Sequence, residues 1–131
     1  MSDFVGRIIK GDFMNQNVIL EKSKKFAIRI INLYKFLANE KKEFVLSKQV
    51  LRSGTSVGAN VKEAVNAQSR ADFISKMSIA LKEAGETEYW LELLHETDYI
   101  SNQQFQSIIT DCKELLKILT SIVKSAKSID N

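Results

Sequence analysis

The clearest structural signal in the chain lies in residues 70–96, which read RADFISKMSIALKEAGETEYWLELLHE. Small and apolar residues recur in this segment at strictly alternating steps of four and three: Phe73, Met77, Ala80, Ala84, Thr87, Leu91 and Leu94. This spacing places all seven side chains on one face of an α-helix. Ser69 and Asp72 form a weak variant of the capping box that starts a helix. We therefore predict an amphipathic helix over residues 70–96, packed in a bundle.

The same kind of spacing predicts three further helices, over residues 17–39, 47–67 and 102–127. The last of them begins at a capping box, Ser101-x-x-Gln104. Their seams consist of Ile19, Ser23, Phe26, Ile30, Leu33 and Leu37; of Val50, Gly54, Val57, Val61 and Ala64; and of Phe105, Ile108, Cys112, Leu115, Leu119, Ile122 and Ala126.

The seam of residues 47–67 is made of small side chains and is accompanied by a Gly-x-x-x-Gly pair, Gly54 and Gly58. A glycine inside a helix costs about 1 kcal/mol relative to alanine, so packing must compensate for it. In a membrane the pair would indicate helix dimerisation, but the surrounding charges rule out a membrane. We therefore expect this helix to approach a neighbouring helix closely within the bundle.

Four long helices with short connections predict an all-α fold, an up-down-up-down antiparallel four-helix bundle. Residues 1–16 lack helical periodicity and are expected to form an N-terminal arm, and residues 128–131 a C-terminal tail. The 131 residues contain no proline, although proline makes up roughly 5% of an average chain. This absence agrees with long uninterrupted helices, because proline removes a backbone N–H and fixes φ.

Composition excludes several classes of protein. One cysteine excludes an internal disulfide and any multi-cysteine metal centre. No segment approaches the roughly 18 uncharged apolar residues of a membrane span, and residues 1–10 do not resemble a secretion signal. We expect a cytoplasmic protein without a membrane partner.

Charge is distributed unevenly along the chain. Residues 1–70 contain 13 Lys and Arg and six Asp and Glu, whereas residues 71–131 contain six Lys and ten Asp and Glu. Three interpretations remain open: the basic half binds phosphate or another acidic partner, basic and acidic faces of neighbouring subunits meet, or the surface is simply solvated. Under the first, the candidate nucleic-acid-binding residues are Lys22, Lys24, Lys25, Arg29, Lys48, Arg52, Lys62 and Arg70.

A polar stripe borders the small-residue seam at steps of four, four and three: Arg52, Ser56, Asn60 and Glu63. Polar groups at the edge of a core need hydrogen-bond partners and can determine register. The stripe is interpreted as a network between helices or subunits, with Glu86 of the third helix as a further candidate interface residue. The alternative is a ligand or RNA contact through Arg52 and Asn60.

Residues that could support catalysis are isolated. Glu92-x-x-His95 has the spacing of a di-iron motif, but a second such motif is missing because the chain has one histidine. His95 is expected to interact with carbonyls at a helix C-terminus. Cys112 is expected to be a small buried hydrophobe, and glycine-rich nucleotide-binding motifs are absent. We predict no enzymatic activity, no cofactor and no metal.

Two segments carry a resemblance, VLRSGTSVGANVKEA at residues 50–64 and SRADFISKMSIALKEAGETEYWLELL at residues 69–94. They resemble the four-helix-bundle family of proteins encoded in intervening sequences of 23S rRNA genes, over about residues 17–125. The matching positions are Asn60, Val61, Glu63, Ser69, Arg70, Phe73, Ala80 and Glu86. Ala64 replaces the glycine usual after the Asn-x-x-Glu motif, so the close packing which that glycine permits is not expected there.

The resemblance implies the four-helix bundle. For related accessory proteins of diversity-generating retroelements it also implies a pentameric ring with a basic surface that meets a reverse transcriptase and nucleic acid. No catalytic residues follow from it. The resulting prediction is a non-enzymatic homo-oligomer, pentameric by resemblance, that binds RNA, DNA or a reverse-transcriptase-like partner through its first two helices. The alternative is an assembly protein whose basic and acidic faces mediate self-association.

Overall fold

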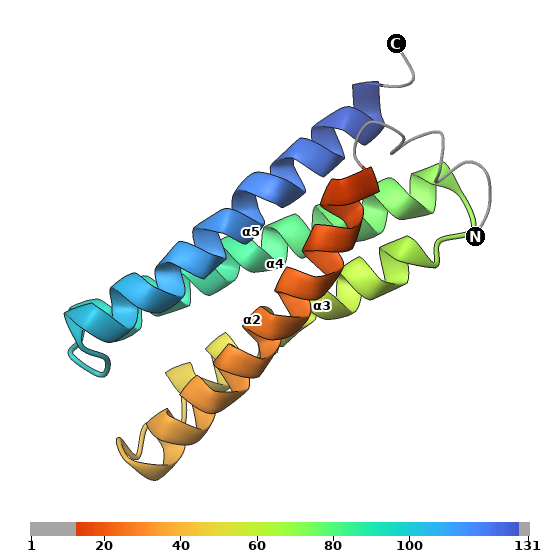
Figure 1. Cartoon of the computed structure of the whole chain (residues 1–131). Coiled ribbons are helices and arrows are strands. Elements are labelled where there is room, and N and C mark those ends of the chain that lie inside the picture. The colour runs from red at the N-terminus through yellow and green to blue at the C-terminus, as the bar shows by residue number, and fades with distance from the viewer. Residues whose placement is uncertain (1–12, 129–131) are drawn as a thin grey trace.

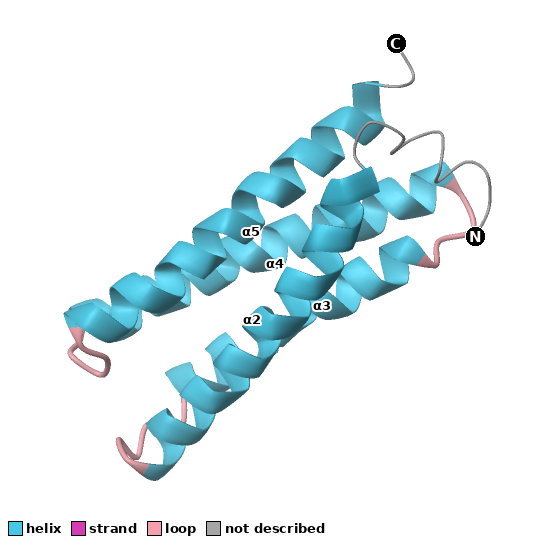
Figure 2. Cartoon of the chain, in the orientation of Figure 1, coloured by secondary structure: helices cyan, strands magenta, loops and turns pink. Residues whose placement is uncertain are grey.

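The computed structural model describes residues 13–128, and their side chains from residue 16 onward. This range contains four helices and no strand, which confirms the predicted all-α class (Figures 1 and 2). The helices are α2 (Phe13–Asn39), α3 (Leu46–Val65), α4 (Arg70–Glu96) and α5 (Asn102–Ser128). None of the four is long and apolar enough to cross a membrane.

The helix boundaries differ from the predicted ones mainly at α2 and α3. The chain is already helical at Phe13, so assigning residues 13–16 to an arm was wrong. The side chain of Gln16, the last residue of this extra turn, is buried. α3 begins one residue early and ends at Val65, because Asn66 turns the chain and donates its N–H to the carbonyl of Glu63 at 3.2 Å.

The other two helices follow the prediction closely. α4 has the predicted bounds, and the Ser69 hydroxyl accepts a hydrogen bond from the Asp72 N–H at 3.1 Å. α5 extends one residue beyond the predicted end, to Ser128. Its capping box is formed reciprocally between Ser101 and Gln104. The remaining parts of the predicted arm and tail, residues 1–12 and 129–131, lie outside the described residues.

The helices lie side by side, and Figure 1 shows the chain reversing at each of three short loops. α3 packs extensively against both α2 and α4, and α5 packs against α4. α2 and α5 contact each other much less than these neighbouring pairs do. The bundle is therefore tight around α3 and loose between its first and last described helices.

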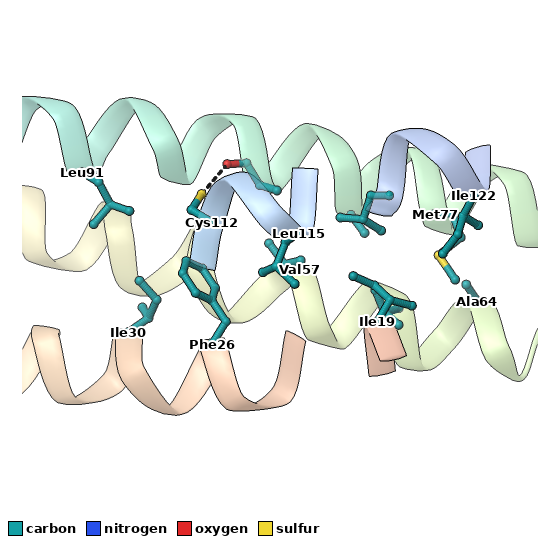
Figure 3. Close-up of a cluster of buried hydrophobic side chains, with 14 of the residues drawn as sticks. Ile19, Phe26, Ile30, Val57, Ala64, Met77, Leu91, Cys112, Leu115 and Ile122 are labelled. Atoms are coloured by element: carbon teal, nitrogen blue, oxygen red, sulfur yellow. Dashed lines mark hydrogen bonds between the residues drawn. The ribbon is translucent and has the colours of Figure 1, made fainter. Parts of the chain in front are cut away.

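The predicted seams form the core. All seven seam residues of α4 are buried, as are the five of α3. Figure 3 shows side chains from all four helices meeting in this cluster, among them Phe26, Val57, Met77 and Leu115. Among the predicted seam residues of α2 and α5, Leu33 and Phe105 are only partly buried. Both belong to the pair of helices that pack loosely.

Two glycines allow α3 to approach α2 closely. A Cβ atom at Gly54 would lie 2.7 Å from Cγ1 of Ile30, and one at Gly58 would lie 3.2 Å from the carbonyl oxygen of Ser23. Gly85 of α4 differs, because a Cβ there would meet no heavy atom of a neighbouring element within 4 Å. The expectation of close packing at the Gly-x-x-x-Gly pair is thus met by direct contact with α2.

These contacts predict opposite effects for two Gly→Ala substitutions. Gly54→Ala should lower the free energy of unfolding by about 1–2 kcal/mol, because overpacking against Ile30 outweighs the gain in helix propensity. Gly85→Ala should raise it by up to about 1 kcal/mol, since the methyl group has room and alanine favours the helix. Urea denaturation measures both, and equal effects of the two variants would contradict this account of α3.

Candidate functional site

The structure divides the eight candidate basic residues into two groups. Four of them form ion pairs within the chain, which neutralise much of their charge. The pairs are Lys22 with Glu114 at 3.0 Å, Lys25 with Glu21 at 2.9 Å, Arg29 with Asp111 at 2.7 Å, and Arg52 with both Glu83 and Glu86. Arg70, at the start of α4, is not free either. The basic face predicted on the first two helices is therefore interrupted by carboxylates.

Three of the eight, Lys24, Lys48 and Lys62, are exposed and form no ion pair with any described residue. Lys24 of α2 and Lys62 of α3 line the same pocket of about 370 Å³. Its lining includes several small residues, among them Ala27, Gly58 and Ala59. The two free lysines therefore frame a shallow hollow between α2 and α3.

Lys35 of α2 is also exposed and forms no ion pair with any described residue. It was missed, although its spacing of eleven residues from Lys24 places both on one side of α2, about 16 Å apart. Lys48 and Lys62 lie similarly on one side of α3, about 21 Å apart.

The two lysine pairs face the same side of the molecule. Gly54 contacts Ile30 and Gly58 contacts Ser23, so α2 and α3 run in opposite directions. This register brings Lys48 level with Lys35. Lys24, Lys35, Lys48 and Lys62 together are called the lysine face below.

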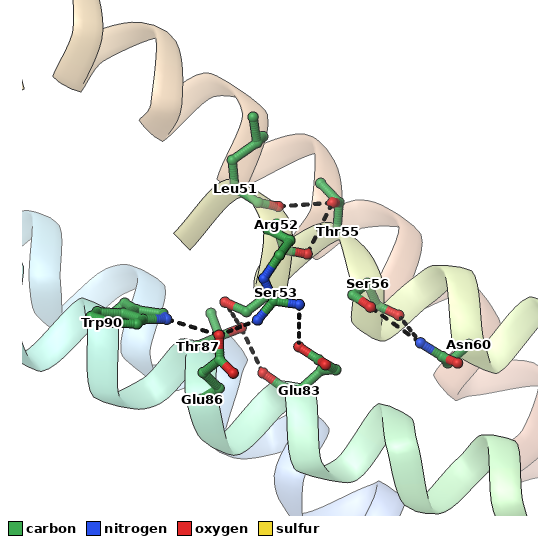
Figure 4. A network of polar contacts seen from close by, with 10 residues as sticks. All are labelled: Leu51, Arg52, Ser53, Thr55, Ser56, Asn60, Glu83, Glu86, Thr87 and Trp90. Atoms are coloured by element: carbon green, nitrogen blue, oxygen red, sulfur yellow. Dashed lines mark hydrogen bonds and ion pairs between the residues drawn. The ribbon is translucent and has the colours of Figure 1, made fainter. Parts of the chain in front are cut away.

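The polar stripe of α3 is divided between two kinds of contact (Figure 4). Arg52 reaches α4, where its guanidinium lies 3.2 Å from Glu83 and also donates to Glu86. Glu63 likewise reaches α4, 3.1 Å from Lys76. Asn60 instead donates to the Ser56 carbonyl and hydroxyl within α3, at 2.9 and 3.2 Å.

Glu86 is the centre of the α3–α4 network. It accepts a hydrogen bond from the Trp90 indole at 3.0 Å as well as from Arg52. The Trp90 N–H and, after it, the Arg52 guanidinium lower the pKa of the Glu86 carboxyl below its ordinary value. Deeper between the same helices, the Thr87 hydroxyl donates to the Ser53 hydroxyl at 2.9 Å. The network thus joins α3 to α4 and leaves little of Arg52 available for a ligand.

His95 and Cys112, two of the residues considered for catalysis, contact other parts of the bundle. His95 stacks on Phe105, with ring centroids 4.2 Å apart and planes 6° from parallel. Within residues 16–128, no three His, Cys, Asp or Glu side chains are grouped so that they could hold a metal ion. Cys112 is buried and lies 3.5 Å from the Ala84 carbonyl, and burial raises the pKa of its thiol to about 12.

The Glu86 network predicts a pH-dependent loss of stability. At neutral pH, Glu86→Gln should lower the free energy of unfolding by about 1 kcal/mol, because a charged acceptor becomes neutral. The folded-state pKa of Glu86 lies below 4.5, so this stabilisation is present above pH 4.5 and is lost as the pH falls further. The difference between wild type and variant should therefore shrink at acidic pH in urea titrations.

Glu88→Gln is the matched control for Glu86→Gln. It is on the same helix and forms no ion pair with another described residue, so its effect should be small at every pH. A Glu86→Gln effect that is the same at neutral and acidic pH would contradict the assignment.

Cys112 should be chemically inert in the folded protein. A thiol with a pKa of about 12 has almost no thiolate at pH 8, and thiolate is the reactive form. An aromatic disulfide reagent should therefore leave the native chain unmodified and label one thiol per chain in guanidinium chloride. Fast labelling of the native protein would show that α4 and α5 separate readily.

Comparisons with known proteins agree with this architecture. The family model described as 23S rRNA-intervening sequence protein matches residues 15–121. This chain is also similar to a crystal structure of a protein with unknown function from the S23 ribosomal protein family of Bacteroides thetaiotaomicron. The two sequences are 64% identical. That similarity has a TM-score of 0.83 and covers 84% of this chain and 98% of the other. No curated protein matches. The family match spans most of the four helices, and the chain belongs to the 23S rRNA-intervening sequence protein family.

Proposed function

We propose that this protein is a non-enzymatic homo-oligomer that binds the phosphate backbone of nucleic acid along the lysine face. The observation that carries the proposal is the position of Lys24 and Lys62, which frame one hollow and lack carboxylate partners among the described residues. Lys35 and Lys48 continue the same side of α2 and α3. Four unpaired ammonium groups on one side suit a polyanion better than a single small anion.

The dimensions of the lysine face support a backbone ligand. Its lysines are spread over about 16–21 Å, a length over which one strand of a duplex makes about five or six steps of 3.4 Å along the helix axis. Lysine contacts to phosphate position a strand without reading its sequence. Binding should therefore weaken steeply with salt and depend little on sequence.

Assembly into a ring, pentameric by family resemblance, would place several lysine faces on one particle. Several weak sites on one particle raise the effective affinity for a long strand through multivalency. A reverse-transcriptase-like partner that carries nucleic acid is compatible with the same surface.

The second candidate function is self-assembly alone. Ile28 and Ile31 are 51% and 39% exposed on α2, close to the lysines. On α4, Glu88, Glu92 and Glu96 form no ion pair with another described residue. The lysine face of one subunit would then meet the acidic side of α4 on the next, a head-to-tail contact of the kind that closes rings.

The lysine face predicts a specific effect of charge reversal on RNA binding. Lys24→Glu/Lys62→Glu should weaken binding of a fluorescent single-stranded RNA more than tenfold, because two phosphate contacts are replaced by repulsion. The slope of log Kd against log salt should also fall by about 1.4–1.8. Fluorescence anisotropy at several salt concentrations measures both quantities.

Lys117→Glu/Lys124→Glu is the matched control for this prediction. It changes the net charge equally on exposed lysines of α5 that form no ion pair within the described chain. Equal losses in both double variants would mean that net charge, and not the lysine face, governs binding. Light scattering on the same variants separates the two functions: loss of the oligomer with no RNA binding by the wild type would favour self-assembly.

A further inference from the structure

A second pocket, of about 490 Å³, opens between the later part of α2 and the start of α5. Its apolar lining includes Leu33, Phe36 and Ile108. It exists because α2 and α5 pack sparsely, and Figure 1 shows them diverging towards the end where the α4–α5 loop lies. The volume is in the range of pockets that bind small organic groups.

The one charge in the lining of the pocket is balanced by a neighbouring carboxylate. Its one cationic residue is Arg29, and no lining residue is acidic. The Arg29 guanidinium is held by Asp111 at 2.7 Å, the Ser107 carbonyl at 3.2 Å and the Ser107 hydroxyl at 2.9 Å. Because Asp111 balances the charge of Arg29 and three hydrogen bonds hold its guanidinium, the pocket suits an uncharged ligand better than a phosphate.

Side-chain amides supply the remaining polarity of the pocket. Asn32 and Gln103 form no hydrogen bond with any described residue, and Gln104 uses only its carbonyl oxygen, which accepts from the Ser101 N–H at 2.8 Å. Each amide offers both a donor and an acceptor. Free amides beside an aromatic ring fit a flat ligand with donors and acceptors around its edge and apolar faces.

Nucleobases have this chemistry. Asn and Gln pair with the edges of bases, adenine above all, and unstacked bases in RNA stack on aromatic side chains. Phe36 supplies the ring, and the Lys41 ammonium lies 5.8 Å from its centroid. A base beside Phe36 would therefore have a cation within reach of its own phosphate.

We propose that the α2–α5 pocket binds an unpaired nucleobase of the strand held by the lysine face, an inference that rests on the proposed function. Asn32 of the pocket is close in sequence to Lys35 of the lysine face, and both lie on α2. A strand crossing α2 passes from one to the other over the width of one helix, about 10–12 Å. The preferred ligand is then single-stranded, because a base in a duplex cannot enter the pocket.

Three RNA probes of about twelve nucleotides test this inference: single-stranded oligoadenylate, an abasic strand of the same length, and a duplex. Oligoadenylate should bind about tenfold tighter than the other two. Asn32→Ala/Gln103→Ala should reduce its affinity to that of the abasic strand, whereas Gln106→Ala, at an exposed position of α5 outside the pocket, should change nothing. Both pocket residues lie at the surface, so the variant should fold.

Free adenosine separates the pocket from the lysine face. Adenosine lacks phosphates, and its titration should shift the side-chain amide NMR signals of Asn32 and Gln103 in the wild type. Such shifts in a protein that binds no strand would uphold the pocket and overturn the proposed function.

Three results would overturn the pocket and leave the lysine face intact. In the first, the abasic strand binds as tightly as oligoadenylate. In the second, adenosine shifts neither amide signal. In the third, Asn32→Ala/Gln103→Ala changes the oligomeric mass measured by light scattering, which would make the pocket a contact between subunits.

Discussion

The close approach of α3 to α2 at Gly54 and Gly58 determines how the rest of the bundle is arranged. With no side chain at these two positions, Ile30 and the backbone of Ser23 pack directly on α3. The opposite edge of α3 is held to α4 by a buried hydroxyl pair and by Arg52 between two carboxylates. α3 is therefore the helix that determines the positions of both neighbours. The contact between α2 and α3 also determines how the four lysines of the lysine face are arranged.

In contrast to this tight packing around α3, the packing between α2 and α5 is loose. α2 and α5 contact each other much less than the neighbouring helices do, but two ion pairs join them, Lys22 with Glu114 and Arg29 with Asp111. Exposed pairs of this kind contribute little stability, so they orient α2 and α5 more than they hold them together. The space left beside Arg29 is the pocket that we assign to a base, and the same ion pair removes Arg29 from the basic surface.

In the folded protein, the uneven charge of the sequence is partly balanced by ion pairs between helices. The basic first half of the chain does not form one basic surface, because carboxylates of α4 and α5 meet several of its cations. What remains is a smaller set of lysines on one side of α2 and α3. Lys25 is the exception, because its partner Glu21 lies four residues earlier on the same helix, a spacing that the sequence already displays. For Lys22, Arg29 and Arg52, sequence position could not show the pairing, since their partners lie on other helices.

Periodicity in the sequence was sufficient to predict the four helices and nearly all of the core, because helical spacing alone decides which residues share a face. It also indicated the close contact at Gly54 and Gly58. The first turn of α2 was missed because residues 13–16 lack the apolar spacing that marks the rest of the helix. Pairing between distant residues, such as Arg29 with Asp111 or Arg52 with Glu86, was decided by the tertiary structure. It depends on which helices become neighbours and in what register, and local spacing carries no information about either.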